Sequence, residues 1–263
     1  MRYLYLLLLL VTLSAQETFS GTTKPFRQIE VAVPEPGILY KIKSTEGDFV
    51  KQGQVIAYLD ATLLRSSLKI AIARAKSKGN IDAAQTTLKL AQKKLQKILQ
   101  LQRQNHIRAE EVEKSQAEVD LATAKLLSTR EAQRVHRYEA ERIKRQIDRH
   151  IIRAPIAGII RQLLKHKGES ISPSEPLCIL VQLDPIRIIS YPNFKQSLKL
   201  KLKQKVKISV DYNNAIYDGY ISFIDPVTDA ASNTVKVTIT VPNKSRSLKT
   251  GIICKIQTAI TQS

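Results

Sequence analysis

The feature that most constrains this chain is a duplicated segment. Residues 33–59 and 154–180 align without a gap at a constant offset of 121 positions. The matched pairs are Pro34/Pro155, Gly37/Gly158, Ile38/Ile159, Gly47/Gly168, Asp48/Glu169, Val50/Ile171 and Leu59/Leu180. A fixed offset across so many positions indicates an internal duplication.

Each copy alternates apolar and polar residues between prolines and glycines, which predicts short strands joined by tight turns. One copy is too short to bury both faces of a sheet, so the two copies together predict a small β-sandwich. The glycines expected at its tight turns are Gly37, Gly47, Gly158 and Gly168.

The segment between the copies, residues 61–150, has a different character. It contains no proline and one glycine, Gly79, and is rich in good helix formers. Both of its ends must return to the sandwich, which predicts two antiparallel helices. With about 42 residues in each arm, the hairpin would be about 60 Å long. A rod of this length is more typical of a segment that reaches a distant partner than of an ordinary packing element or a solvated linker.

Apolar residues step by three and four along both arms, as in a heptad seam. The expected seam positions are Ile81, Ala84, Leu88, Ala91, Leu95 and Ile98, then Val112, Ser115, Val119, Ala122, Leu126, Thr129, Gln133, His136, Ala140, Ile143 and Ile147. The seam is weaker at Thr129, Gln133 and His136. The polar stretch 102–108 predicts the connecting turn, and Asn105 is its best turn residue.

The two ends of the chain complete the expected organisation. Residues 1–15 combine Arg2 with the apolar run Leu4–Leu13, which predicts a secretory signal; an uncleaved anchor or a buried terminal helix are the alternatives. No apolar run reaches the roughly 18 residues needed to span a bilayer. From Asp184 onward, alternating strands predict a small barrel, with a short helix over Asn193–Leu200 and a turn at Asp218-Gly219.

The expected domains are therefore a signal peptide (1–15), an N-terminal linker (16–29), a first half-module (30–60), the helical hairpin (61–150), a second half-module (151–183) and a β-barrel (184–263). The fold class is mixed α and β, elongated and multi-domain. The exported chain would lie in the periplasm.

Composition excludes several classes of function. The formal charge is +19, and residues 61–105 alone carry ten Lys/Arg and one acid, yet the hairpin has one aromatic residue, Tyr138, so no nucleic-acid partner is predicted. The basic arm is a solvated face or meets an acidic surface on a neighbouring subunit or membrane protein. Met1 is the only methionine, and the four histidines have no Cys or carboxylate partner at recognisable spacing, so neither catalysis nor a metal site is predicted.

Two cysteines, Cys178 and Cys254, lie in apolar strand-like runs. Buried small apolar residues are the expected state, and a disulfide would require the two segments to pack together.

The order and spacing of these motifs resemble those of the periplasmic adaptor proteins, or membrane fusion proteins, of the HlyD and RND type. The resemblance covers residues 30–258 and rests on Val33-Pro34-x-x-Gly37-Ile38, Glu46-Gly47-Asp48, Arg153-Ala154-Pro155-x-x-Gly158-Ile159, Gly168-Glu169, Val241-Pro242-Asn243 and Leu248-Lys249-Thr250-Gly251. It implies a biotinyl-lipoyl-like β-sandwich split by an antiparallel coiled-coil hairpin and followed by a β-barrel.

The family resemblance also implies partners. A member joins an inner-membrane transporter to an outer-membrane channel of the TolC type and self-associates into a ring, usually hexameric, in a tripartite efflux pump. In RND-associated members the tip often carries Arg, then Leu four positions on and Ser seven further. Here that frame holds Lys97, Leu101 and Arg108, so the last position departs. The tip residues expected to contact the channel are Lys97, Leu101, Arg103, Asn105, Ile107 and Arg108.

Two rival functions are weighed against this one. A swinging-arm carrier needs a modified lysine between the half-motifs, but the junction Leu59–Leu64 has none, so no cofactor is expected. An adaptor of an ABC-type or type I secretion exporter stays open, although the short N-terminal run and the reach of about 60 Å favour an RND-type transporter. A membrane-proximal domain, which many family members have, is expected to be absent or rudimentary.

Overall fold

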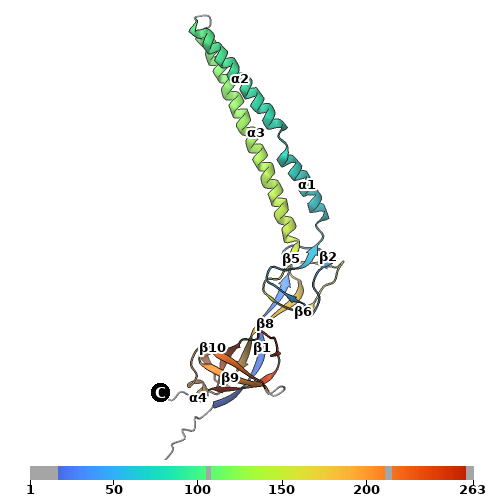
Figure 1. Ribbon diagram of the computed structural model, residues 1–263, viewed down its shortest axis with the longest axis vertical. Helices are drawn as coiled ribbons and strands as arrows, with labels where there is room; N and C mark the ends of the chain where they lie inside the picture. The colour runs from blue at the N-terminus through green and yellow to red at the C-terminus, as the bar shows by residue number, and fades with distance from the viewer. Residues whose placement is uncertain (1–16, 105–107, 211–214, 259–263) are drawn as a thin grey trace, which may run out of the picture. The chain divides into compact units, whose positions relative to one another are not determined.

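The computed structural model describes residues 17–104, 108–210 and 215–258. The chain is mixed α and β, with a long helical hairpin and β domains (Figure 1). In chain order the elements are β1 (Glu17–Ala32), β2 (Gly37–Ile42), β3 (Phe49–Val50), β4 (Val55–Leu59), α1 (Thr62–Lys76), α2 (Gly79–Arg103), α3 (Ala109–Arg149), β5 (Ile151–Arg153), β6 (Gly158–Leu163), β7 (Ser170–Ile171), β8 (Pro176–Ser190), α4 (Phe194–Ser197), β9 (Lys205–Val210), β10 (Ile216–Asp229), β11 (Thr234–Val241) and β12 (Ile253–Thr258).

The chain divides into two compact units. The strand unit holds the described residues up to Val33, Ile42–Ile56 and the residues from Arg153 onward. The hairpin unit holds Pro34–Lys41 and Ala57–Ile152, and so contains all three long helices.

The duplication is visible in the hydrogen bonds of the strand unit. The Thr45 N–H donates to Asp48 Oδ2 (2.7 Å), and the His166 N–H, 121 positions later, donates to Glu169 Oε1 (3.1 Å). The same offset relates the bond from the Lys51 N–H to Gln54 Oε1 and the bond from the Ser172 N–H to Glu175 Oε2, both 3.0 Å long. The two copies therefore build the same pair of turns. Within the first turn of each copy, Gly47 and Gly168 adopt φ of +89° and +92°, values that favour glycine.

The two copies are also hydrogen-bonded to each other. Strand β3 of the first copy pairs antiparallel with β6 of the second. Beside this ladder, the Gly53 N–H donates to Ala154 O (2.8 Å) and the Ala154 N–H donates to Gln54 O (2.9 Å). The side chains of Val50 and Ile160 are completely buried. Within the strand unit, residues 42–56 of the first copy are therefore hydrogen-bonded to the second copy.

The turn expectation is wrong for Gly37 and Gly158, which begin strands β2 and β6 without a positive φ. Gly158 is constrained by packing instead, because a Cβ there would lie 2.5 Å from the carbonyl oxygen of Val181 on the neighbouring strand β8. At Gly37 a Cβ would make only an ordinary contact with Leu59 at 3.5 Å.

Six strands of the strand unit pair in a closed circuit, which we call the strand ring. The antiparallel pairings run β1–β12–β9–β10–β11–β8 and return to β1. The expected linker at 16–29 is therefore wrong: residues 17–32 form β1, whose residues 17–22 pair with β12 and whose residues 21–32 pair with β8. Pro25 is accommodated at an irregularity of the β1–β8 ladder. The boundary expected at residue 183 lies inside the continuous strand β8.

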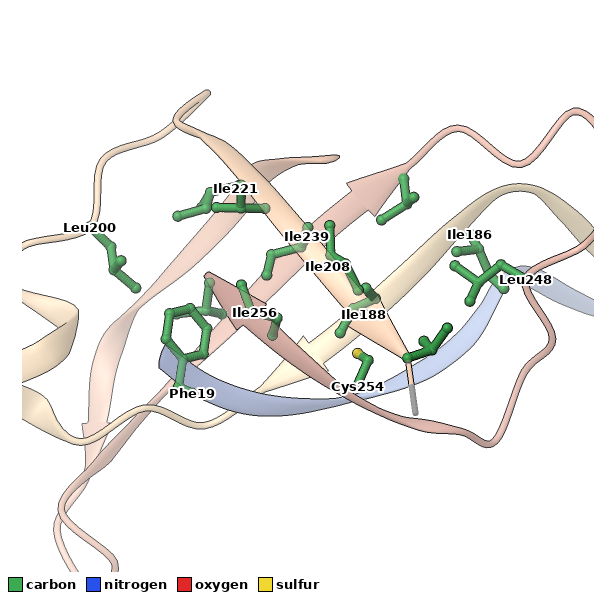
Figure 2. Close-up of a cluster of buried hydrophobic side chains, with 14 residues drawn as sticks. Phe19, Ile186, Ile188, Leu200, Ile208, Ile221, Ile239, Leu248, Cys254 and Ile256 are labelled. Carbon is green, nitrogen blue, oxygen red and sulfur yellow. The ribbon is translucent and has the colours of Figure 1, made fainter. Parts of the chain in front are cut away.

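The interior of the strand ring is aliphatic (Figure 2). Phe19 and Leu200 lie at one end of this cluster, and Ile186 and Leu248 lie at the other. Gly219 was expected in a turn but lies within β10, where a Cβ would meet Ile208 Cδ1 at 2.9 Å. The ring needs glycine there because the core leaves no room for a side chain.

Two buried polar residues fasten the loop between β11 and β12. Asn243 donates from Nδ2 to the carbonyl oxygens of Leu183 and Leu248, both at 2.9 Å. Thr23 of β1 donates from Oγ1 to Lys249 O and accepts from the Ile252 N–H, both at 2.9 Å. The motifs Val241-Pro242-Asn243 and Leu248-Lys249-Thr250-Gly251 thus help to close the strand ring.

The hairpin consists of three helices rather than two, since α1 and α2 are separated at Ser77 and Lys78. Both pack along α3 (Figure 1). Gln133 of α3 contacts Ser77, whereas Glu118, earlier in α3, contacts Lys94, later in the first arm. This reversed order shows that the arms are antiparallel.

The expected seam is confirmed with one exception. All of its positions in α2 and α3 are buried or half-buried except His136, which is exposed. His136 borders a pocket at the α1–α2 break, together with Arg74, Ser77 and Asn80. The seam prediction failed there because the break interrupts the helix that would have covered the imidazole.

Gln133 explains why the seam is polar at this level. Its Nε2 donates to Ser77 O at 2.9 Å and to Ala75 O at 3.3 Å, the carbonyls at the end of α1. A helix that ends in mid-hairpin leaves its last carbonyls without an intrahelical partner. The amide from α3 supplies the missing donor, which an aliphatic seam residue could not do.

We predict that Gly158→Ala lowers the stability of the strand unit by about 1–3 kcal/mol, because the new methyl group collides with backbone that cannot move aside cheaply. The midpoint of urea unfolding measures the effect. Gly37→Ala, at the equivalent position of the first copy, is the matched control and should change stability by less than about 0.5 kcal/mol. Equal midpoints for the two variants would contradict the packing role of Gly158.

We predict that Gln133→Ala costs about 1 kcal/mol of hairpin stability, because two helix-end carbonyls lose their donor. Helical circular dichroism during urea unfolding measures the loss, and amide hydrogen exchange should accelerate around residues 75–80. Gln116→Ala is the control, since the Gln116 amide donates only to exposed Asp120 on its own helix. Identical behaviour of the two variants would sink the bridging role.

Candidate interaction surfaces of the hairpin

The described residues near the turn between α2 and α3 form the candidate tip. Helix α2 ends at Arg103 and α3 begins at Ala109. Lys97, Arg103 and Arg108 are exposed, whereas Leu101 is half-buried against the seam. The expected tip residues Asn105 and Ile107 lie outside the described residues. The structure therefore brings four of the six expected contacts to one end of the hairpin.

The two helices carry opposite charges near this tip. The exposed cations on α2 include Lys89, Lys93 and Lys97, and the exposed anions at the start of α3 are Glu110, Glu111 and Glu113. Glu110 and Glu111 lie in the first turn of α3, where carboxylates stabilise the positive end of the helix dipole. Among the described residues, none of these six side chains forms an ion pair within the chain. One edge of the hairpin is basic, and the other is acidic.

A shallow apolar groove lies between α2 and α3, and the sequence analysis did not identify it. It is lined by Thr87, Leu90, Ala91, Lys94, Glu118, Leu121, Ala122 and Lys125. Leu90 is 64% exposed and Leu121 is 72% exposed, although both are large and apolar. Lys94 and Glu118 cross the groove as an ion pair of 2.7 Å. Such an exposed pair adds little stability but fixes the register of the helices. The signal for the groove was a leucine on each helix one position before a seam residue.

The thiols do not form a disulfide: Cys178 and Cys254 are both free and buried. Burial raises the pKa of each thiol to about 11. Since thiolate is the reactive form, both cysteines are chemically quiet near neutral pH. This agrees with the expectation of small buried apolar residues.

The histidines and acids of the described residues serve local structure. His166 does have a carboxylate neighbour, contrary to the sequence analysis: its Nδ1 lies 3.1 Å from Glu169 Oε1, on an exposed turn of the second repeat. Hydrogen bonds from the Thr62 hydroxyl and N–H lower the pKa of Asp60, just before α1. In the part of the chain that the structure describes, no group of three metal-binding side chains is found.

None of the described helices is both long enough and apolar enough to span a lipid bilayer.

Comparison with known proteins adds a family match. Residues 190–262 match the family model of the CusB-like, beta-barrel domain. These residues include α4 and β9–β12, and so most of the strand ring.

Two curated relatives cover most of the chain. Multidrug resistance protein MdtA of Proteus mirabilis (strain HI4320) is 25% identical over 253 residues, covering 90% of this chain and 58% of that protein. Multidrug efflux pump subunit AcrA of Escherichia coli (strain K12) is 23% identical over 250 residues, covering 89% and 60%. The chain thus spans about 60% of the length of these relatives.

A solved structure supports the fold. MacA from Actinobacillus actinomycetemcomitans superposes with a TM-score of 0.78 at 20% identity, covering 94% of this chain and 79% of MacA. The likeness extends over both the hairpin and the strand unit. The split repeat, the inserted hairpin and the following strand ring occur in the expected order, and the sequence and structure comparisons together indicate a membrane fusion, or periplasmic adaptor, protein.

Proposed function

We propose that this chain is a non-catalytic periplasmic adaptor of a tripartite efflux pump. It links an inner-membrane transporter, of the RND type, to an outer-membrane channel of the TolC type. It acts on the periplasmic side of the inner membrane, and several copies, six in the family's usual assembly, form a ring. The names of the relatives, a multidrug resistance protein and a multidrug efflux pump subunit, support drug efflux over type I secretion.

One observation carries this proposal: a duplicated β-module is interrupted by a helical hairpin. The 41-residue helix α3 alone is about 60 Å long. We infer that the module is lipoyl-like, that the hairpin is an antiparallel coiled coil and that the strand ring is the adaptor's β-barrel. The narrow seam of the hairpin builds a rod rather than a globular core, and a rod suits contact with a distant partner.

The tip is the proposed contact with the channel. Leu101 supplies a half-buried apolar anchor, and Lys97 and Arg108 supply exposed cations around it. An apolar side chain surrounded by charged groups is the common arrangement of a small interface hot spot. Arg103 extends the basic surface, and Asn105 and Ile107 are proposed to complete it.

The groove is the proposed contact between copies. Leu90 and Leu121 offer exposed apolar area, and the basic edge on α2 complements the acidic edge at the start of α3. A head-to-tail contact would place the lysines of one copy against the glutamates of the next. Contacts of this kind close into rings when the rotation between copies permits.

We predict that Leu101→Asp abolishes channel docking, because it places a charge at the apolar anchor. The loss should be at least about 2 kcal/mol, roughly thirty-fold in affinity. Dye efflux in cells that depend on this chain, together with cross-linking to the outer-membrane channel, measures the effect. Leu63→Asp is the control, because Leu63 is 84% exposed near the start of α1. Normal efflux by a folded Leu101→Asp variant would refute the tip assignment.

We predict that Leu121→Asp shifts the chain from oligomer to monomer, whereas Leu127→Asp does not. Both leucines are exposed on α3, but only Leu121 lines the groove. Sedimentation velocity at a series of protein concentrations measures the shift. Unchanged oligomerisation in Leu121→Asp would remove the groove from the ring contact while leaving the tip proposal intact.

A further inference from the structure

The segment between β8 and β9 has an unusual charge composition. Residues 190–207 contain six lysines and no acid: Lys195, Lys199, Lys201, Lys203, Lys205 and Lys207. All six are exposed. The segment includes the four-residue helix α4 and leads directly into the strand ring. This is the most concentrated single-sign surface among the described residues of the strand unit.

Large apolar side chains protrude between these lysines. Phe194, Leu198 and Leu202 recur every fourth position and are 41%, 69% and 62% exposed. Soluble surfaces rarely present apolar side chains in such close succession. We call these three residues and the lysines at 195, 199, 201 and 203 the basic–apolar surface.

The outward direction of this surface is fixed by its neighbours. Leu200, between the two exposed leucines, is 7% exposed and packs in the core of the strand ring (Figure 2). Ser197 is buried and donates from Oγ to Phe194 O. Asn193 caps α4, accepting from the Gln196 N–H at 2.9 Å. The segment therefore cannot roll to bury Leu198 and Leu202 in its own core.

The β-hairpin beside α4 carries the acidic side chains that could approach these lysines. The hairpin of β10 and β11 reaches α4, since Asn193 pairs with Thr234. Two of its three carboxylates accept hydrogen bonds from backbone of their own turns: Asp225 from the Val227 N–H, and Asp229 from the Ala231 and Ser232 N–H groups. The third, Asp218, lies opposite Lys207 in the β9–β10 ladder. Those bonds lower the pKa of Asp229. Neither Asp225 nor Asp229 forms an ion pair with Lys195, Lys201 or Lys203 among the described residues.

Helix α4, which carries part of the basic–apolar surface, lies at the end of the strand ring where β1 begins (Figure 1). Glu17 pairs with Thr258, and Thr258 pairs with Val206 at the start of β9. In the sequence, the apolar run Leu4–Leu13 comes shortly before Glu17. Whether that run directs export or stays as an anchor, the chain enters the ring at this end.

We propose that the basic–apolar surface docks on an anionic phospholipid membrane. The lysines face phosphate headgroups, and Phe194, Leu198 and Leu202 insert below them. Each near-surface lysine contributes roughly a five-fold factor to binding of anionic lipid. A folded protein partner would need acidic groups paired with each lysine and pockets for three separate side chains. A bilayer accepts both features without a complementary shape.

The absence of tryptophan from the chain permits a direct test. Phe194→Trp places a single indole in the proposed contact, and Ile216→Trp places one at an exposed site at the far end of β10, where Ile216 pairs with Ser209. The full-length variants are mixed with vesicles of phosphatidylcholine and phosphatidylglycerol in equal parts, and with vesicles of phosphatidylcholine alone. We expect a blue shift, and quenching by brominated lipid, only for Phe194→Trp with the anionic vesicles.

Substitutions in the surface separate its two components. Lys195→Gln, Lys201→Gln and Lys203→Gln together should weaken vesicle binding about a hundred-fold and flatten its salt dependence. Leu198→Gln with Leu202→Gln should weaken binding but leave the salt dependence. The charge-matched control replaces Lys69, Lys89 and Lys93 on the hairpin with Gln. It should bind as the parent does, because these lysines lie on α1 and α2, outside the basic–apolar surface.

Three outcomes would overturn the proposal: no spectral shift for Phe194→Trp, equal shifts for both indoles, or equal losses in the surface and hairpin lysine variants. If vesicle binding is unaffected by the surface substitutions but association with the transporter is lost, the occupant is an acidic protein surface and the membrane proposal fails. The vesicle assay contains neither transporter nor channel. Its failure is therefore distinguishable from failure of the adaptor function.

Discussion

The hydrogen bonds exchanged between the two repeats are the constraint on which the structure depends. The chain leaves the module after the first copy and must return in register, so that Gly53 and Gln54 can meet Ala154. That requirement allows the intervening residues 61–150 to leave and return only as antiparallel arms. Because Gly158 has no side chain, β6 can lie close to β8. A Cβ at this position would stand 2.5 Å from the carbonyl oxygen of Val181. A long insertion is tolerated because the entropic cost of closing a loop grows slowly with its length. Packing along the helical seam offsets most of the remaining cost.

Features that recur at a regular spacing were predictable from the sequence. The constant offset of the repeats and the three-four spacing of the seam identified the module and nearly every buried position of α2 and α3. Strand β1 was missed because its sequence contains Gly21 and Pro25 and lacks a long aliphatic run. Its strand character comes from partners at least 144 positions away, in β8 and β12. Pairing of this kind leaves no local pattern, so the closure of the strand ring could not be inferred from 16–29 alone.

In the hairpin, too, some features were predictable from the sequence and others were not. Lys97, Leu101 and Arg108 were found from the family spacing and Arg103 from the polar stretch 102–108, and all four lie near the α2–α3 turn. The α1–α2 break at Ser77 and Lys78 was missed because no proline marks it, although Gly79 directly follows it. The weak seam at Thr129, Gln133 and His136 was the available signal. A polar residue in an apolar seam indicates that something opposite it needs a hydrogen bond, and Gln133 meets that need at Ser77 O.

The exposed leucines of the two units differ in the charges around them, and this difference separates their partners. Leu90 and Leu121 are flanked by Lys94, Lys125 and Glu118, so their surroundings carry both signs. A surface of mixed sign can complement a second copy of itself, because each lysine finds a carboxylate on the same kind of face. In the sequence, the charged residues next to Leu198 and Leu202 are all lysines: Lys195, Lys199, Lys201 and Lys203. Two such surfaces would repel one another, so self-association is excluded there. A phospholipid bilayer is anionic at its headgroups and apolar beneath them, so it suits both components of the proposed surface.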